Sequence, residues 1–147
     1  MLKCNGDDSG FTLSGTQDDA INIGPVFESY TFKEGADVVV DMNDKELDQK
    51  KLSAQILVDT GSPLCCIDDC IAQKLGIPVI GTQEEQGKSR NMYKAAIWLP
   101  DGRLYTPKDG FMGYETSPHN IILGRQFLLR YLFECDVHNG TYKFSKR

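Results

Sequence analysis

The chain has 147 residues, of which 40% are hydrophobic and 25% are charged, and its formal net charge is −5. This is the length of one domain with enough apolar residues for a core, and the absence of a basic cluster argues against a nucleic-acid partner. No run of about 18 apolar residues occurs, and the first ten residues lack the apolar stretch of a secretory signal, so we expect no membrane association.

Residues 1–23 are rich in Gly, Asp, Ser, Thr and Asn, which predicts an extended N-terminal arm. A folded domain is expected over 24–147, beginning at Gly24-Pro25. Its first part predicts strands and a polar loop from apolar runs and turn residues. The strands are expected at 26–32, 38–40 and 53–58, and the loop at 41–51.

The second half of the chain predicts further short strands and two short helices. One helix is expected from Ile67, with Asp68 and Asp69 as capping carboxylates and Gly76 at its end. A second helix is expected over 125–131, and Asn139-Gly140 predicts a two-residue hairpin turn. The remaining strands are expected at 77–80, 92–99, 103–106, 120–123, 132–137 and 141–144. This pattern favours an all-β, barrel-like fold with one or two short helices.

The most informative segment is 56–62, where three apolar strand residues lead directly into Asp59-Thr60-Gly61. A carboxylate at the end of a buried strand is desolvated, so it must be hydrogen-bonded or share a proton. Thr60 adds a hydroxyl, and Gly61 permits a tight backbone turn. Taken alone, the tripeptide fits a surface turn better. A second segment, 119–125, combines a buried strand with Gly124, which would allow this strand to pack closely behind the turn.

Together, residues 57–62 and 120–125 resemble the paired motifs of the retropepsin family of aspartic proteases, and 67–76 resembles its bacterial branch. The resemblance covers roughly 25–145 and implies a small closed β-barrel, with 24–147 as the catalytic domain. It also implies a homodimer in which each subunit supplies one catalytic aspartate. Asp59 matches that aspartate, while Thr60 and Gly61 match the rest of the catalytic loop.

The implied activity is that of an aspartic endopeptidase acting on a peptide or protein substrate. Two carboxylates held close together share one proton. The ionised carboxylate takes a proton from a water that attacks the peptide carbonyl, and the protonated one donates to the developing oxyanion. This chemistry needs no metal and no cofactor.

Substrate contacts are expected from Ser62 and from Gly87, near the tip of a flap over roughly 81–93, although 83–89 fits a plain surface loop equally well. A Ser62 hydroxyl bonded to the catalytic carboxylate would favour ionisation and extend activity to lower pH. Arg125 matches a family arginine whose usual acidic partner is replaced here by Pro63. We therefore expect Arg125 to bond elsewhere, with Asp68 or Asp69 as candidates.

The five cysteines are an odd number, and Cys65 and Cys66 are adjacent, which is unlike a disulfide framework. Reduced thiols in a cytoplasmic protein explain the pattern better. Cys65, Cys66 and Cys70 lack a second Cys/His pair for a tetrahedral zinc site, so no metal is expected.

Several alternatives stay open at this point. The chain could be a catalytically silent peptide-binding or oligomerisation module with the same fold, or it could process its own arm at 1–23. A cysteine nucleophile paired with His119 or His138 has no supporting motif. The hairpin at 132–144 and the strand at 26–32 are each candidates either for dimer contacts or for completing the monomer.

Overall fold

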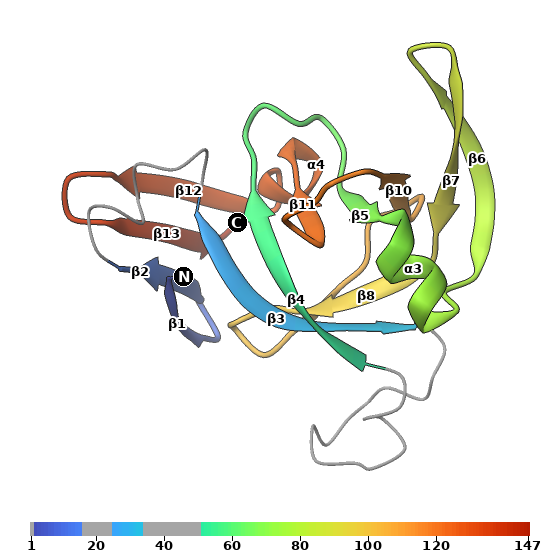
Figure 1. Cartoon of the computed structure of the whole chain (residues 1–147). Coiled ribbons are helices and arrows are strands. Elements are labelled where there is room, and N and C mark those ends of the chain that lie inside the picture. Colours follow the sequence, from blue (N-terminus) through green and yellow to red (C-terminus); the bar gives the residue numbers. More distant parts are fainter. Residues whose placement is uncertain (1, 16–24, 34–50) are drawn as a thin grey trace.

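A computed structural model describes residues 2–15, 25–33 and 51–147 of the chain (Figure 1). The strand expected at 38–40, most of the loop expected at 41–51 and the arm boundary at 23/24 lie outside the described residues. The described elements are β1 (Lys3–Asp7), β2 (Gly10–Ser14), β3 (Val26–Lys33), β4 (Lys51–Val58), β5 (Cys66–Asp68), α3 (Asp69–Leu75), β6 (Val79–Glu85), β7 (Lys88–Tyr93), β8 (Ala95–Trp98), β9 (Leu104–Tyr105), β10 (Phe111–Tyr114), β11 (Ile121–Leu123), α4 (Arg125–Leu128), β12 (Tyr131–Asp136) and β13 (Thr141–Lys146).

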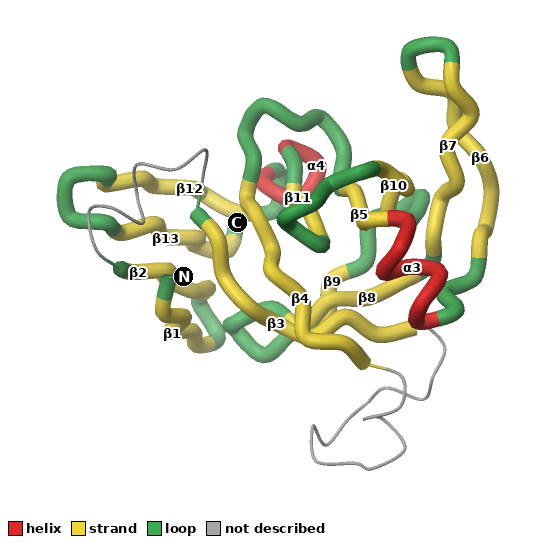
Figure 2. The backbone as a smooth tube through the Cα atoms, viewed as in Figure 1, coloured by secondary structure: helices red, strands yellow, loops and turns green. Residues whose placement is uncertain are grey.

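The strands form two sheets, and the expected mostly-β architecture with two short helices is confirmed (Figure 2). The larger sheet has the order β6-β7-β10-β5-β11-β4-β3-β8-β9, and the smaller one has the order β1-β2-β13-β12. The closed barrel is wrong, because within the described residues the edge strands β6 and β9 do not pair with each other. Figure 1 shows the reason: β6 runs with β7 into a hairpin that projects away from the body of the sheet.

The extended arm expected at the N-terminus is not what residues 3–14 form, because they fold into the β1–β2 hairpin. Leu13 is fully buried and Phe11 is stacked on Phe144 with ring centroids 4.4 Å apart. Burying such side chains stabilises the fold by about 1.5–3 kcal/mol each. The alternation of Phe11 and Leu13 with Thr12 and Ser14 is the strand signal that composition alone concealed.

An aromatic cluster joins the two sheets and fixes the position of α4. Phe127 of α4 lies with its ring centroid 5.1 Å from that of Tyr131 and 5.1 Å from that of Tyr105. Tyr131 in turn lies edge-on to Phe11 and Phe144. The short helix that follows Gly124 is therefore anchored in the core rather than lying loosely on the surface.

Two local expectations near α3 are corrected. Residues 66–68 form β5, between β10 and β11, so the helix starts at Asp69 rather than at Ile67. Asp68 makes no side-chain capping bond: its carboxylate accepts from the Thr116 N–H at 3.4 Å, while Asp69 accepts from the Tyr93 hydroxyl at 3.0 Å. Gly76 ends the helix in the left-handed conformation at φ 62°, as expected.

The strand expected at 92–99 is divided into β7 and β8 at Lys94, whose N–H leaves the ladder and donates to the Pro78 carbonyl at 3.0 Å. The C-terminal hairpin has a four-residue loop, not a two-residue turn, because Asp136 still pairs with Thr141. The Asp136 carboxylate accepts from the Asn139 N–H at 3.2 Å and so shapes this longer loop.

None of the helices among the described residues is long and apolar enough to cross a membrane. Within the same residues, no group of three or more Cys, His, Asp or Glu side chains is arranged to hold a metal ion.

Candidate active site

Asp59 stands at the carboxyl end of β4, which lies between β3 and β11 in the sheet. Its backbone N–H donates to the Leu123 carbonyl at 2.9 Å, extending the parallel ladder in which Leu123 is the partner of Val58. The Val58 N–H donates to the Pro25 carbonyl at 2.9 Å on the other side. The backbone that carries this carboxylate is therefore held from both neighbouring strands.

The turn after Asp59 orients the carboxylate through the backbone. The Gly61 N–H donates to Asp59 Oδ1 at 2.8 Å, and the Ser62 N–H donates to the Asp59 carbonyl at 3.2 Å. A Cβ at Gly61 would lie 3.1 Å from Asp59 Oδ1, which is tighter than an ordinary contact. Asp59 is half-buried and Thr60 is exposed, so the carboxylate is fixed yet still reaches solvent.

The second motif packs behind this turn as the sequence predicts. The Arg125 N–H donates to the Ser62 carbonyl at 2.8 Å, and the Gln126 N–H donates to the Pro63 carbonyl at 3.1 Å. A Cβ at Gly124 would lie 2.4 Å from both the Ser62 and the Leu64 carbonyl oxygens, so no larger residue fits between these segments. The two motifs form one hydrogen-bonded unit.

Arg125 does bond elsewhere, but not to Asp68 or Asp69. Its Nη1 donates to the Thr60 carbonyl oxygen at 2.9 Å. The Arg125 side chain therefore holds the backbone of the exposed part of the turn at Thr60. The Thr60 hydroxyl has no hydrogen-bond partner among the residues that the structure describes. The family resemblance implies that this hydroxyl bonds to the opposite loop of a dimer, which stays a prediction.

The expected bond from Ser62 to the catalytic carboxylate is wrong for this chain. The Ser62 hydroxyl donates to the Leu64 carbonyl at 2.7 Å. A hydroxyl has one proton to donate, and here it is used inside the turn.

Replacing Ser62 with alanine is therefore expected to leave the acidic limb of a pH–rate profile unmoved. It should lower the free energy of unfolding by about 1 kcal/mol, the usual cost of one lost hydrogen bond. Peptide cleavage between pH 3 and 7, together with urea unfolding of both proteins, measures the two quantities. A shift of the acidic limb without any loss of stability would contradict this reading.

The segment expected to be either a flap or a plain loop is a hairpin of β6 and β7. Gln86 and Gly87 form its two-residue turn, with φ of 50° and 78°. Both angles are positive, which is the geometry of the tight turn that suits the twist of a hairpin. Gly87 thus lies at the tip, and the hairpin projects beyond the sheet (Figure 1).

A small apolar cluster lies between the base of this hairpin and the turn at 59–62, the predicted catalytic turn. Its buried members are Cys66, Met92 and Met112, with Leu64, Tyr114 and Ile122 packed against them. Leu64 follows the catalytic turn, whereas Met92 belongs to β7 of the hairpin. We call these six residues the cleft cluster.

The buried thiols argue against a cysteine nucleophile. Burial raises the pKa of Cys66 to about 11 and also raises that of Cys65. Both thiols therefore stay protonated at neutral pH, whereas a nucleophilic cysteine needs its thiolate.

Three residues of this region were missed from sequence: Glu85, Arg90 and Tyr114. The Arg90 guanidinium lies over the Tyr114 ring, 4.0 Å from its centroid, with Glu85 beside it. The polar composition of 83–89 suggested a surface loop. The alternation of Lys88, Arg90 and Met92 is the available signal that these side chains share one face of a strand.

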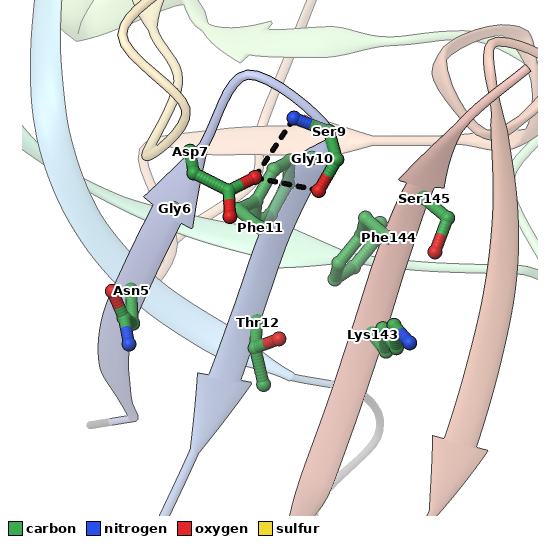
Figure 3. Close-up of a pocket in the computed structure, with 10 residues that line it drawn as sticks. All are labelled: Asn5, Gly6, Asp7, Ser9, Gly10, Phe11, Thr12, Lys143, Phe144 and Ser145. Carbon is green, nitrogen blue, oxygen red and sulfur yellow. Dashed lines mark hydrogen bonds between the residues drawn. The ribbon is translucent and has the colours of Figure 1, made fainter.

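A separate polar hollow of about 300 Å³ lies over the turn between β1 and β2 and beside β13 (Figure 3). There the Asp7 carboxylate accepts from the Ser9 hydroxyl at 2.6 Å and from the Ser9 N–H at 2.8 Å. These bonds lower the pKa of Asp7 below its ordinary value. None of the predicted catalytic residues lines this hollow, so it is not the candidate active site.

A buried strand leads into Asp-Thr-Gly, and a strand-Gly-helix segment is hydrogen-bonded behind this turn. These features are those of a retropepsin-like fold. A solved structure of a retropepsin-like aspartic protease from Rickettsia conorii aligns with the chain at a TM-score of 0.51. The alignment covers 99% of this chain and 97% of that chain, with 14% sequence identity. No protein-family model and no curated protein matches the sequence.

Proposed function

We propose that this chain is an aspartic endopeptidase that works as a homodimer, with Asp59 of each subunit facing its counterpart. The observation that carries the proposal is the position of the Asp59 side chain, its hydrogen bond and its partial exposure. Its carboxylate ends a buried strand, accepts the Gly61 N–H at 2.8 Å and remains half-exposed. A carboxylate fixed by a backbone donor and open on one side can hold a water together with a second carboxyl group.

In the proposed reaction the two carboxyl groups share one proton, because both cannot stay ionised at close range. The ionised group accepts a proton from the bound water as the water attacks the peptide carbonyl. The protonated group donates to the carbonyl oxygen, which gives a neutral tetrahedral intermediate. Its collapse transfers a proton to the leaving nitrogen and releases the two peptide products.

The surface beside the catalytic turn supports a second copy as the partner. A groove of about 420 Å³ is lined by Arg125, Leu128, Leu129 and Arg147, and Leu129 is 78% exposed. Arg125 connects this groove to the catalytic turn through the Thr60 carbonyl. A subunit that covers Leu129 would bring its own turn close to Thr60. β3 offers less edge for this role, because it pairs with β4 over Val26–Phe32 and with β8 over Thr31–Lys33.

The substrate in this proposal is an extended peptide lying between the β6–β7 hairpin and the catalytic turn. The cleft cluster favours apolar side chains next to the cut bond. The compartment that fits is a reducing one such as the cytoplasm, since all five cysteines are free and Cys4, Cys70 and Cys135 are exposed.

Replacing Asp59 with asparagine tests the proposal directly. The variant keeps the side-chain shape but cannot share a proton, so cleavage of a peptide library should fall about 1,000-fold or more. Product peptides are identified by mass spectrometry across pH 3–8. The matched control is Asp109→Asn, an exposed carboxylate outside the site, which should cleave like the wild type.

Equal cleavage by wild type and Asp59→Asn would overturn the protease assignment. No cleavage by either protein, combined with retained peptide binding, would favour the silent peptide-binding module instead.

A further inference from the structure

Glu85 and Arg90 form a charged pair next to the cleft cluster, on the β6–β7 hairpin. In the hairpin register Gly81 pairs with Met92, Gln83 with Arg90 and Glu85 with Lys88. Directly paired residues and alternate residues along a strand lie on the same face of a hairpin. Glu85, Lys88 and Arg90 therefore share the face of Met92, which packs against Cys66 and Met112 in the cleft cluster.

Arg90 is held in place, but its hydrogen-bonding capacity is not used. Its guanidinium lies 4.0 Å from the centroid of the Tyr114 ring. Its Nε lies 3.9 Å from Glu85 Oε2, which is an ion-pair distance but too long for a hydrogen bond. Both of these atoms are buried, and neither has a hydrogen-bond partner among the described residues.

The Arg90 guanidinium is therefore fixed in position but has no hydrogen-bond acceptor among the described residues. A guanidinium carries five N–H donors in a rigid fork, and none of those of Arg90 is bonded within the described part of the chain. The Arg90 side chain is 18% exposed, so part of it can be reached from outside. Stacking on Tyr114 fixes the plane of the fork, which reduces the entropy lost when a ligand binds.

The chemistry of the group specifies the ligand. A carboxylate accepts two parallel N–H bonds from a guanidinium, and this pairing is stronger than a neutral hydrogen bond. Lys88 is the register partner of Glu85 across the hairpin, so it lies on the same face. The face thus presents two cations, Lys88 and Arg90, against one carboxylate, which favours an acidic ligand over a basic one.

The pair lies close to the catalytic turn, with Cys66 between them. The charges of Glu85 and Arg90 both act on the Cys66 thiol, which is buried in the cleft cluster. Leu64 of the turn also packs against the cleft cluster. A peptide that places an apolar side chain on this cluster therefore passes within reach of Arg90.

We propose that Arg90 is a specificity-determining residue that binds an acidic side chain of the substrate on the flap side of the cleft cluster. Side chains of an extended peptide alternate between its two faces, so the acidic residue lies two positions from the apolar residue on the cluster. The inference rests on the proposed function, whose site it extends, and it names an apolar-x-acidic pattern as the preferred substrate class.

The test compares matched peptides. A peptide cleaved by the wild type is remade with Glu or Gln at each position, and kcat/KM is measured for every pair. One position should favour Glu about tenfold or more, the range for a hydrogen bond to a charged group. Arg90→Gln should bring that Glu/Gln ratio to about one, Arg90→Lys should keep part of it, and Lys94→Gln, an exposed cation outside the site, should keep all of it.

A binding experiment separates this inference from the proposed catalysis. The affinity of fluorescent Glu and Gln peptides is measured on the Asp59→Asn protein with and without Arg90→Gln. A Glu preference that disappears with Arg90→Gln supports the inference even if the wild type cleaves nothing. A Glu preference that survives Arg90→Gln, no Glu preference at any position, or a Lys preference abolished by Glu85→Gln would overturn it.

Discussion

Mixing wild-type chains with Asp59→Asn chains is expected to lower the cleavage rate more than dilution of the wild-type chains alone would. If each active site needs one Asp59 from each of two subunits, a mixed dimer has half a site. At equal concentrations, random pairing leaves about one quarter of the dimers with two aspartates. After exchange of subunits, cleavage should therefore fall to about a quarter of that of the same total concentration of wild type.

The mixture is measured as initial cleavage rate against the fraction of wild-type chain, with sedimentation velocity reporting the dimer in each sample. Asp109→Asn chains serve as the matched control and should leave the rate unchanged at constant total protein. A rate directly proportional to the wild-type fraction would mean that each chain carries a complete site. That result would contradict the homodimeric site while leaving the catalytic role of Asp59 intact.

Replacing Gly124 with alanine is expected to cause the largest loss of stability of any single methyl group added near the site. The new Cβ would lie 2.4 Å from the carbonyl oxygens of Ser62 and Leu64. Both atoms belong to the backbone, so neither can rotate away as a side chain would. The free energy of unfolding should fall by about 3 kcal/mol, the upper part of the usual range for overpacking, and cleavage should be lost with it.

Urea unfolding followed by circular dichroism measures this loss, and Gly81→Ala is the matched control. A Cβ at Gly81 meets no heavy atom within 4 Å, so the control should change stability by less than about 1 kcal/mol. Equal stability of the two variants would mean that Gly124 does not fill the gap between the two motifs.

The turn that carries Asp59 was predictable because its signals are local. Three apolar residues before Asp59 mark a buried strand, and Gly124 after a second apolar run marks a close approach of backbones. Both inferences depend on neighbouring residues and on elementary sterics, and the structure agrees with each.

The features that were missed depend on partners far away in the sequence. The residues next to Arg90 in the sequence do not predict that it lies over the Tyr114 ring. That contact depends on the pairing of β7 with β10. The Ser62 hydroxyl had two possible acceptors within a few residues, and only the path of the turn decides between them. The open sheet was equally hidden, since strand periodicity does not show whether the edges meet.

The pairing of β2 with β13 places residues from opposite ends of the sequence in one ladder, with Phe11 opposite Phe144. Closing so long a loop costs chain entropy before any contact in that ladder repays it. Folds dominated by such distant contacts form slowly, and this sheet can be completed only after β13 has emerged from the ribosome. Until β13 has paired, the turn that carries Asp59 would stand next to an unfinished sheet, so we expect the proposed site to become ordered only after β13 has been synthesised.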